Sequence, residues 1–394
     1  LSPVLEIEGD VYKSIKVKQI APTMPVGSTE LRPHRLKVGL YDITGDKLSR
    51  RKNVELDVTG ALTEVTELAG EKTADLVLIN DGDQSYAKLR FDDRSIATMK
   101  SHLGKLDDSL SRGLIWASLW DSTRDGELAA SDYVTIALNA LAGETDIATV
   151  TITVMQIDTA IWSYASDANR EKLREQAANA FEKFLDGAAA GSDHQLQYAK
   201  SFADFAYTPA QFEKIKAILN GSINGLTVDA DLRWFVFICG VKRGIFNAAD
   251  IETEAAKDMT AHGKQYAALA HAALPNAAAK ASAFKAITTD NLSNTIHAYT
   301  CRGFNLAIHR ELLVPFVDKY FESILEVWET KGFEIAETTA TMLFPAWVIS
   351  EDTVSKAEHW LAVTGKDASH AMRRTVAEGR DSMTRSLKAR AADK

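Results

Sequence analysis

The chain has 394 residues and a mass of 43.1 kDa, with a formal net charge of -9 and a sequence pI near 5.6. A chain of this length exceeds the size at which one hydrophobic core keeps growing, so we expect two or more packed units. The composition, 46% hydrophobic and 25% charged with 8 Pro, is typical of an ordinary folded protein and argues against extensive disorder. The negative net charge repels a phosphate backbone, so we expect neither nucleic acid nor an anionic membrane surface as the main partner. Local basic patches are compatible with a negative net charge.

The two cysteines, Cys239 and Cys301, lie far apart in apolar surroundings. This spacing fits reduced core thiols of a cytoplasmic protein better than a disulfide framework. No apolar run approaches the ~20 residues needed to cross a bilayer, and neither end carries a secretory apolar segment. We therefore expect a cytoplasmic protein without a membrane partner. The chain starts at Leu1 rather than Met, so we also expect an excised segment, and an upstream targeting signal is compatible with that expectation.

Residues 1–90 predict β structure. Turn chemistry separates the predicted strands at Gly9-Asp10, in the segment 22–33 with its Gly27, at Gly45-Asp46 and at 80–82. The strands themselves are alternating or β-branched runs at 5–8, 11–20, 36–43, 54–58 and 76–79. Short strands at this spacing predict a small β-sandwich domain at 1–90.

Residues 91–394 predict helices throughout, so the fold class is mainly α. In one stripe the apolar residues Leu313, Val317, Tyr320, Ile324 and Trp328 step by 4, 3, 4 and 4, which predicts one helix over 310–331. About fifteen such helices, mostly ~10 to 20 residues long with short links, are best buried as an irregular α-superhelix of stacked antiparallel pairs, similar to HEAT and armadillo arrays. No strict repeat is visible.

Aromatic and acidic clusters in the helical part have two interpretations each. All seven tryptophans coincide with apolar stripes, so core packing is the simpler interpretation, and a ligand-stacking platform is the alternative. Carboxylate clusters such as Glu322, Glu326 and Glu329 have helical spacing and indicate a solvated face. Two carboxylates that act as general acid and general base can come from distant parts of a chain, so they cannot be recognised without the fold.

The known catalytic motifs are missing from the sequence. A zinc peptidase needs H-E-x-x-H, because this spacing puts both imidazoles on one helix face, and none of the nine histidines has a partner at a spacing of three to five. The nucleophile elbow G-x-S-x-G, the P-loop, G-x-G-x-x-G and C-x-x-C are missing as well. We therefore predict no catalytic residue, no metal ligand and no cofactor in this chain, and surface or capping roles for its histidines.

The C-terminal segment is net basic, because eight Lys or Arg from Lys366 onward, Arg373, Arg374 and Arg390 among them, face four acids. These cations complement a helix C-terminus in the simpler interpretation. In the functional interpretation they attract an acidic surface or a peptide carboxylate.

Several strings resemble the C-terminal region of bacterial, actinobacterial-type aminopeptidase N proteins, the ERAP1-like C-terminal domain with its preceding β-sandwich. The match is spread over nearly the whole chain, and the strings are specific in combination and weak one by one. They are residues 1–3 (LSP), 31–41 (LRPHRLKVGLY), 78–88 (LINDGDQSYAK), 116–124, 232–234, 312–316, 320–321, 328–329 and 343–345. The string at 78–88 is close to the pattern N-D-x-D-x-x-Y-x-K.

The resemblance implies a non-catalytic half of a zinc aminopeptidase. In that family the zinc site and the G-A-M-E-N strip lie upstream, so the zinc is expected in a catalytic domain outside this chain, and that domain and peptides are the expected partners. By analogy the helical bowl at 91–394 closes over the active site, limits entry to peptides and contacts their distal part. For peptide contacts we nominate Arg302, Arg373 and Arg374, because guanidinium groups suit a carboxylate. The alternative is a free-standing helical-repeat scaffold for protein partners.

Overall fold

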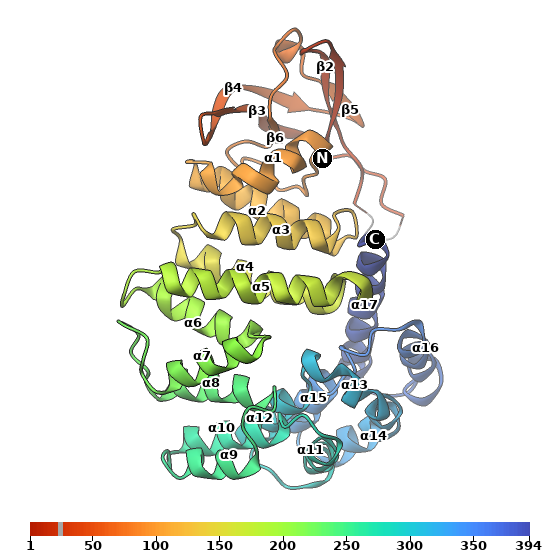
Figure 1. The fold of residues 1–394 in the computed structure, drawn as a ribbon. Coiled ribbons are helices and arrows are strands. Elements are labelled where there is room, and N and C mark those ends of the chain that lie inside the picture. Colours follow the sequence, from red (N-terminus) through yellow and green to blue (C-terminus); the bar gives the residue numbers. More distant parts are fainter. Residues whose placement is uncertain (23–26) are drawn as a thin grey trace. The chain divides into compact units, whose positions relative to one another are not determined.

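The computed structural model describes residues 1–22 and 27–394, so part of the predicted turn segment 22–33 lies outside the described residues. The fold is mainly α with a small N-terminal β part, as predicted (Figure 1). The chain divides into two compact units, residues 1–160 with Asp393 and residues 161–392 with Lys394. The first unit groups the strands with the first helices, and the domain division at 90 and 91 stays a prediction.

The β part consists of two antiparallel three-stranded sheets, ordered β1-β2-β5 and β4-β3-β6. All five predicted strands are confirmed. The additional strand β5 has only three residues, too few for a recognisable alternation. The bounds are β1 Ser2–Glu8, β2 Val11–Lys18, β3 His34–Thr44, β4 Lys47–Val58, β5 Leu62–Glu64 and β6 Leu76–Ile79.

The two sheets share one hydrophobic core, which confirms the predicted β-sandwich. Alternate residues of β3, Leu36, Val38 and Leu40, point into it, because successive side chains of a strand face opposite sides. The glycines of the predicted turns at Gly9 and Gly45 have positive φ values of 67° and 66°, which a residue with a Cβ adopts at a cost. The core residues include Tyr12, Ile15, Val17, Leu36, Val38, Leu40, Val54, Val58, Val77 and Ile79.

Four helices complete the first unit. Asp92, Asp108 and Asp146 each accept hydrogen bonds from backbone N–H groups of the following first turn, so each caps its helix. α1 packs on β6 and α3, and α3 contacts α2 and α4. The bounds are α1 Asp93–His102, α2 Ser109–Arg124, α3 Ala130–Leu141 and α4 Ile147–Thr159.

The second unit is helical. Figure 1 shows α5 to α9 following one another in a stack, and the long α17 packs on α15 and α16. The bounds are α5 Asp167–Gly187, α6 Asp193–Phe205, α7 Pro209–Leu219, α8 Ala230–Val241, α9 Ala248–Ala255, α10 Ala261–Ala272, α11 Ala277–Thr289, α12 Asn294–Phe304, α13 Arg310–Leu313, α14 Val317–Thr330, α15 Phe333–Met342, α16 Glu351–His359 and α17 His370–Ala392. Two stretches, Ala160–Tyr164 and Trp360–Thr364, are π-helical.

The prediction of one continuous helix over 310–331 was wrong. A short 3₁₀ segment, Val314–Phe316, separates α13 from α14. Pro315 lies in this segment, and proline has no N–H to donate and a ring that clashes with the preceding turn. The predicted apolar stripe is nevertheless correct: Leu313 and Tyr320 are buried and Trp328 is half-buried.

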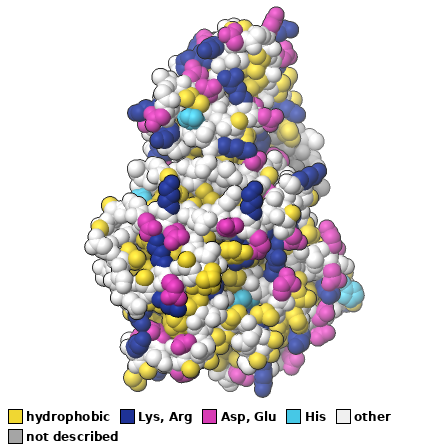
Figure 2. Space-filling view, viewed as in Figure 1, with side chains coloured by type: hydrophobic (Ala, Val, Ile, Leu, Met, Phe, Trp, Pro, Cys, Tyr) yellow, Lys and Arg dark blue, Asp and Glu magenta, His cyan; other side chains and the backbone are white. Residues whose placement is uncertain are grey.

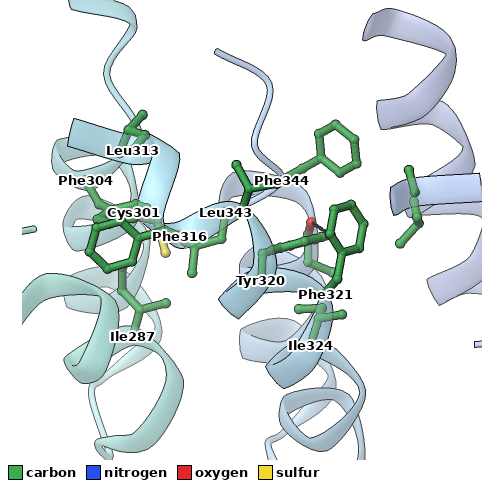
Figure 3. Packing of buried hydrophobic residues seen from close by; sticks show 14 of the residues in the cluster. Ile287, Cys301, Phe304, Leu313, Phe316, Tyr320, Phe321, Ile324, Leu343 and Phe344 are labelled. Carbon is green, nitrogen blue, oxygen red and sulfur yellow. Dashed lines mark hydrogen bonds between the residues drawn. The ribbon is translucent and has the colours of Figure 1, made fainter. Parts of the chain in front are cut away.

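The predicted core roles of the cysteines and tryptophans are confirmed. Cys239 and Cys301 are both buried free thiols. Trp234 and Trp360 are 1% exposed, and none of the seven tryptophans belongs to the exposed class. Figure 3 shows one cluster of the second unit, where α14 packs against residues of α11 and α12 on one side and of the segment after α15 on the other. The labelled residues are Ile287, Cys301, Phe304, Leu313, Phe316, Tyr320, Phe321, Ile324, Leu343 and Phe344.

Candidate functional site

Several histidines make hydrogen bonds within the protein, and the prediction of surface or capping roles was wrong for His297 and His309, which are buried. Nδ1 of His34 lies 2.6 Å from the Ser85 hydroxyl, and Nε2 of His309 donates to the Lys242 carbonyl at 2.7 Å. Over residues 1–22 and 27–394, no group of three or more His, Cys, Asp or Glu side chains is arranged to hold a metal ion. The donor set in this part of the chain therefore does not fit a zinc site.

The string at 78–88 surrounds a buried carboxylate, that of Asp81. Asp81 is 0% exposed and follows the last residues of β6. Its oxygens accept hydrogen bonds from the Tyr41 hydroxyl at 2.7 Å, from Arg50 Nη1 at 2.9 Å and from the Ser111 hydroxyl at 3.3 Å. Burial and the neighbouring Asp81 carboxylate both raise the pKa of Tyr41, so its hydroxyl stays a donor. The carboxylate thus links β3, β4 and α2.

Two backbone features make room for this carboxylate. A Cβ on Gly39 would lie 2.5 Å from Asp81 Oδ2, so a side chain there would displace the carboxylate. Asn80 has a φ of 62°, a left-handed conformation that asparagine tolerates, and its amide group bonds to both the N–H and the carbonyl of Ser85. Asn80 and Asp81 of the family-like string at 78–88 therefore have a structural role at the end of the sandwich, because their polar groups are bonded inside the protein.

The three nominated arginines lie in the second unit on two helices. Arg302 of α12 is exposed, and its guanidinium lies 5.1 Å from the ring centre of Tyr299 on the same helix. Arg374 of α17 is exposed and bonds to Glu378 one turn on. Arg373 of α17 donates through Nη1 to the carbonyls of Leu361 and Gly365, at 2.8 and 2.6 Å. Arg302 and Arg374 are therefore both exposed, with Arg374 paired to Glu378, whereas Arg373 is bound to backbone.

A pocket of about 480 Å³ lies between α14, α16 and the π-helical stretch after α16. The rings of Phe321 and Trp360 form its apolar side. The Asp318 carboxylate and Lys356 form its polar side and bond to each other at 2.7 Å, a bond that raises the pKa of Lys356. This combination suits a ligand with an apolar body and a polar end. The lining residues are Asp318, Phe321, Glu322, Ser355, Lys356, His359, Trp360 and Thr364.

Lys280 is the charged side chain that sequence reasoning missed most completely. It is 0% exposed, and its Nζ donates to the carbonyls of Ala272, Gly303 and Phe304 at 2.8 to 2.9 Å. These carbonyls end α10 and α12, where carbonyl groups lack helical partners and cations are favoured. Three acceptors require three N–H donors, which only the protonated amine has. Burial opposes this charge and lowers the pKa of Lys280 to about 7.

A signal for Lys280 exists in the sequence. Ala283, Phe284 and Ile287 follow it at steps of three, four and seven, so Lys280 stands on the apolar stripe of its helix. Arg170 of α5 has the same signal, because Leu173 and Ala177 continue its stripe and it is also 0% exposed. A charge at a core position of a helix predicts a buried polar contact, although it does not reveal the partner.

The face of the molecule shown in Figure 2 has no single dominant charge. Figure 2 shows Lys and Arg interspersed with Asp and Glu over the face in view, with hydrophobic side chains gathered over helices of the second unit. Among the described residues, no helix combines the length and the apolar character that a membrane crossing requires.

Two comparisons relate this chain to known proteins. A family model described as ERAP1-like C-terminal domain matches residues 76–385. Aminopeptidase N of Streptomyces lividans is 41% identical over 401 residues, which cover 100% of this chain and 47% of that relative. The chain thus spans about half the length of this relative. Both matches confirm the resemblance that the sequence strings indicated.

Proposed function

The chain belongs to the ERAP1-like C-terminal domain family, and from this we propose that it is the non-catalytic C-terminal part of a zinc aminopeptidase of the aminopeptidase N type. The observation that carries the proposal is that the whole of this chain, which has no H-E-x-x-H, matches 47% of an aminopeptidase N. The catalytic zinc would then belong to an upstream domain, the principal partner of this chain. Two buried free thiols support a cytoplasmic location for the whole protein.

The proposed role of this part is to enclose the chamber over the active site and to bind and select peptides by size. Stacked helices of the second unit offer a large surface, and the pocket between α14 and α16 offers an apolar wall beside carboxylates. Asp318 and Glu322 suit a cationic side chain of a peptide, while Phe321 and Trp360 suit its apolar part. The exposed guanidinium groups of Arg302 and Arg374 suit a carboxylate, and Arg373 completes the nominated set.

Comparing the isolated chain with the full-length protein tests whether catalysis and zinc binding require the upstream domain. We expect the isolated chain to release no nitroaniline from aminoacyl nitroanilides and to bind less than stoichiometric zinc, measured by metal analysis. The full-length protein is expected to release nitroaniline and to bind one zinc ion per chain. Turnover by the isolated chain with one zinc per chain would refute the proposal.

The nominated arginines are tested in the full-length enzyme. Replacing Arg302, Arg373 and Arg374 by Gln is expected to raise KM for longer peptides and to leave the hydrolysis of aminoacyl nitroanilides unchanged, because the latter do not reach this part. Unchanged kinetics for peptides of every length would remove these residues from the peptide site.

A free-standing scaffold for protein partners is the second candidate, favoured by the stacked helices. Reading the upstream coding sequence separates the two. An open frame with H-E-x-x-H and a glutamate about 18 residues later supports the aminopeptidase, since this is the ligand pattern of such zinc sites. A start codon close to Leu1 supports the scaffold.

A further inference from the structure

The pocket between α14 and α16 has an excess of negative charge. Asp318 and Glu322 line it one turn apart on α14, so both carboxylates lie on the same side of the pocket. Lys356 of α16 bonds to Asp318 at 2.7 Å and to Asp352 at 2.8 Å, so two acids share its single charge. In the part of the chain that the structure describes, Glu322 forms no ion pair. One lysine therefore faces more acids than it can neutralise.

The acidic side of the pocket is open to solvent. The side chain of Asp318 is 66% exposed, and Glu322 is exposed as well. A ligand can therefore reach both carboxylates without a rearrangement of the helices.

The floor of the pocket is apolar and narrow. Phe321 and Trp360 form it, and they are 8% and 1% exposed. Aromatic rings and carboxylates both attract an ammonium group, the rings through the negative charge of their faces. Because little of each ring is accessible, the floor suits a ligand with a short apolar body.

The wall that carries Trp360 is fixed by the surrounding structure. A Cβ on Gly365 would overlap the indole ring of Trp360, so the glycine allows the ring to pack closely against the backbone. Arg373 donates to the carbonyls of Leu361 and Gly365, on either side of the π-helical turn. π-helical turns are rare and frequently lie at functional sites. A wall that is already in place lowers the free-energy cost of binding.

We propose that this pocket binds a small organic amine in its protonated form, with the ammonium group at Asp318 and Glu322 and a short apolar body over Phe321 and Trp360. An anion is disfavoured, because Lys356 already bonds to two acids. The inference goes beyond the proposed function, since such a ligand binds whether or not the chain belongs to a peptidase. The competing explanation is a groove between two helices that holds only water.

The test measures binding of three small probes to the 394-residue chain by saturation-transfer NMR at low salt. Phenethylamine has the ammonium group and an apolar body, phenethyl alcohol has the same body without the charge, and phenylalanine adds a carboxylate. We expect phenethylamine to bind with a Kd on the order of 1 mM, as is usual for a ligand of this size, and the alcohol to bind at least about tenfold more weakly.

The third probe distinguishes two sources of the ammonium group. Weaker binding of phenylalanine than of phenethylamine, which we expect because its carboxylate would face Asp318 and Glu322, identifies a simple amine as the ligand. Equal or tighter binding of phenylalanine identifies a free α-amino acid, and both results support an ammonium site. Binding of the amine no tighter than that of the alcohol, or no binding of the amine, would overturn the proposal.

Variants assign the binding to the pocket. Glu322→Gln is expected to weaken amine binding about fivefold or more, because it removes one of the two carboxylates. Glu326→Gln removes the same charge from an exposed position of α14 outside the pocket and is the matched control, with unchanged affinity expected. Equal losses in both variants would mean that only the net charge of the chain attracts the amine, and would refute the site.

Ser355→Trp tests the pocket without changing any charge. Ser355 is an exposed lining residue, so an indole ring at this position fills the pocket and is expected to abolish binding while the melting temperature stays close to that of the wild-type chain. Unchanged amine binding in this variant would show that the ligand lies elsewhere. Failure of these binding tests leaves the proposed aminopeptidase role intact, because the latter is decided by the upstream coding sequence and by zinc analysis.

Discussion

At the residue scale, the most informative side chains are charged groups that water does not reach. Asp81, Arg170 and Lys280 are each 0% exposed. A buried charge is costly unless it is paired or hydrogen-bonded, and each of these has found such partners. Asp81 binds two hydroxyls and a guanidinium group, while Lys280 binds three carbonyl groups. Removing the charged member is therefore expected to leave polar partners unsatisfied.

Asp81→Asn tests the buried carboxylate of the first unit. We expect a loss of about 2–3 kcal/mol in the free energy of unfolding, because the amide turns one acceptor oxygen into donors that face Arg50 and the Tyr41 hydroxyl. Urea denaturation followed by circular dichroism measures this. Asp57→Asn, which affects an ion pair with Arg35 on the surface, is the control and is expected to cost under about 0.5 kcal/mol. Equal effects would contradict the role of Asp81.

Lys280→Met tests the amine that binds the terminal carbonyl groups of α10 and α12. At pH 7 we expect a loss of about 2 kcal/mol, since three carbonyl groups lose their donor while a buried charge is also removed. Lys285→Met on the exposed side of α11 is the matched control, with little change expected. Stability of both variants is measured by urea denaturation.

The pH dependence of the same variant gives an independent check. The pKa of Lys280 is lowered to about 7 in the folded chain, against about 10.4 in the unfolded chain. Between these values the unfolded state binds more protons, so the wild-type chain gains stability relative to Lys280→Met as the pH rises. We expect a gain of about 1–2 kcal/mol between pH 7 and 9. A constant difference over this range would show that the amine keeps an ordinary pKa.

At the element scale, α17 explains part of the basic C-terminal segment. Two of its arginines serve the two π-helical stretches: Arg373 binds carbonyls at residues 361 and 365, and Arg390 binds those at 162 and 163. Helix ends leave carbonyl groups without partners, and arginine supplies several donors in a fixed geometry. The cations at these positions are therefore bound to backbone inside the protein.

Arg373→Gln tests this role of α17. We expect a loss of about 1–2 kcal/mol in the free energy of unfolding and faster amide exchange over residues 361–365, because two carbonyl groups lose a charged donor. Hydrogen exchange and urea denaturation measure both effects. The neighbouring exposed Arg374→Gln is expected to change neither. Similar exchange rates in the two variants would mean that Arg373 does not hold the stretch.

At the scale of the whole molecule, charge decides what kind of partner the chain accepts. The net charge is -9, and both signs are interspersed over the face shown in Figure 2. A net negative charge of this size repels a polyanion overall.

Duplex DNA tests this conclusion. We expect a dissociation constant above about 100 µM at physiological salt, weaker than ordinary non-specific binding. Fluorescence anisotropy with a labelled duplex measures it, and a control titration at low salt shows whether any binding is electrostatic. Micromolar binding with a steep salt dependence would contradict the expectation.

A feature of this chain could be predicted from the sequence when the residues that form it are close together in the chain. Five strands and the apolar stripes were predictable because their periods lie within a few neighbouring residues, whereas β5 is too short to have a period. The break at Pro315 was overlooked although proline signals it directly. Arg302 and Arg374 were nominated by residue type alone, which does not tell an open guanidinium group from one such as Arg373 that is bound to backbone.

The sequence by itself determined the mainly α fold with its β start and the family, since local periods and short strings carry this information. Only the tertiary structure decided what each buried charge binds. Arg390 and the Trp162 carbonyl that it binds are more than two hundred positions apart in the chain, and so no local pattern relates them. The partners of a charge depend on which helices pack together, and packing is settled by apolar faces that say nothing about the polar groups they bring along.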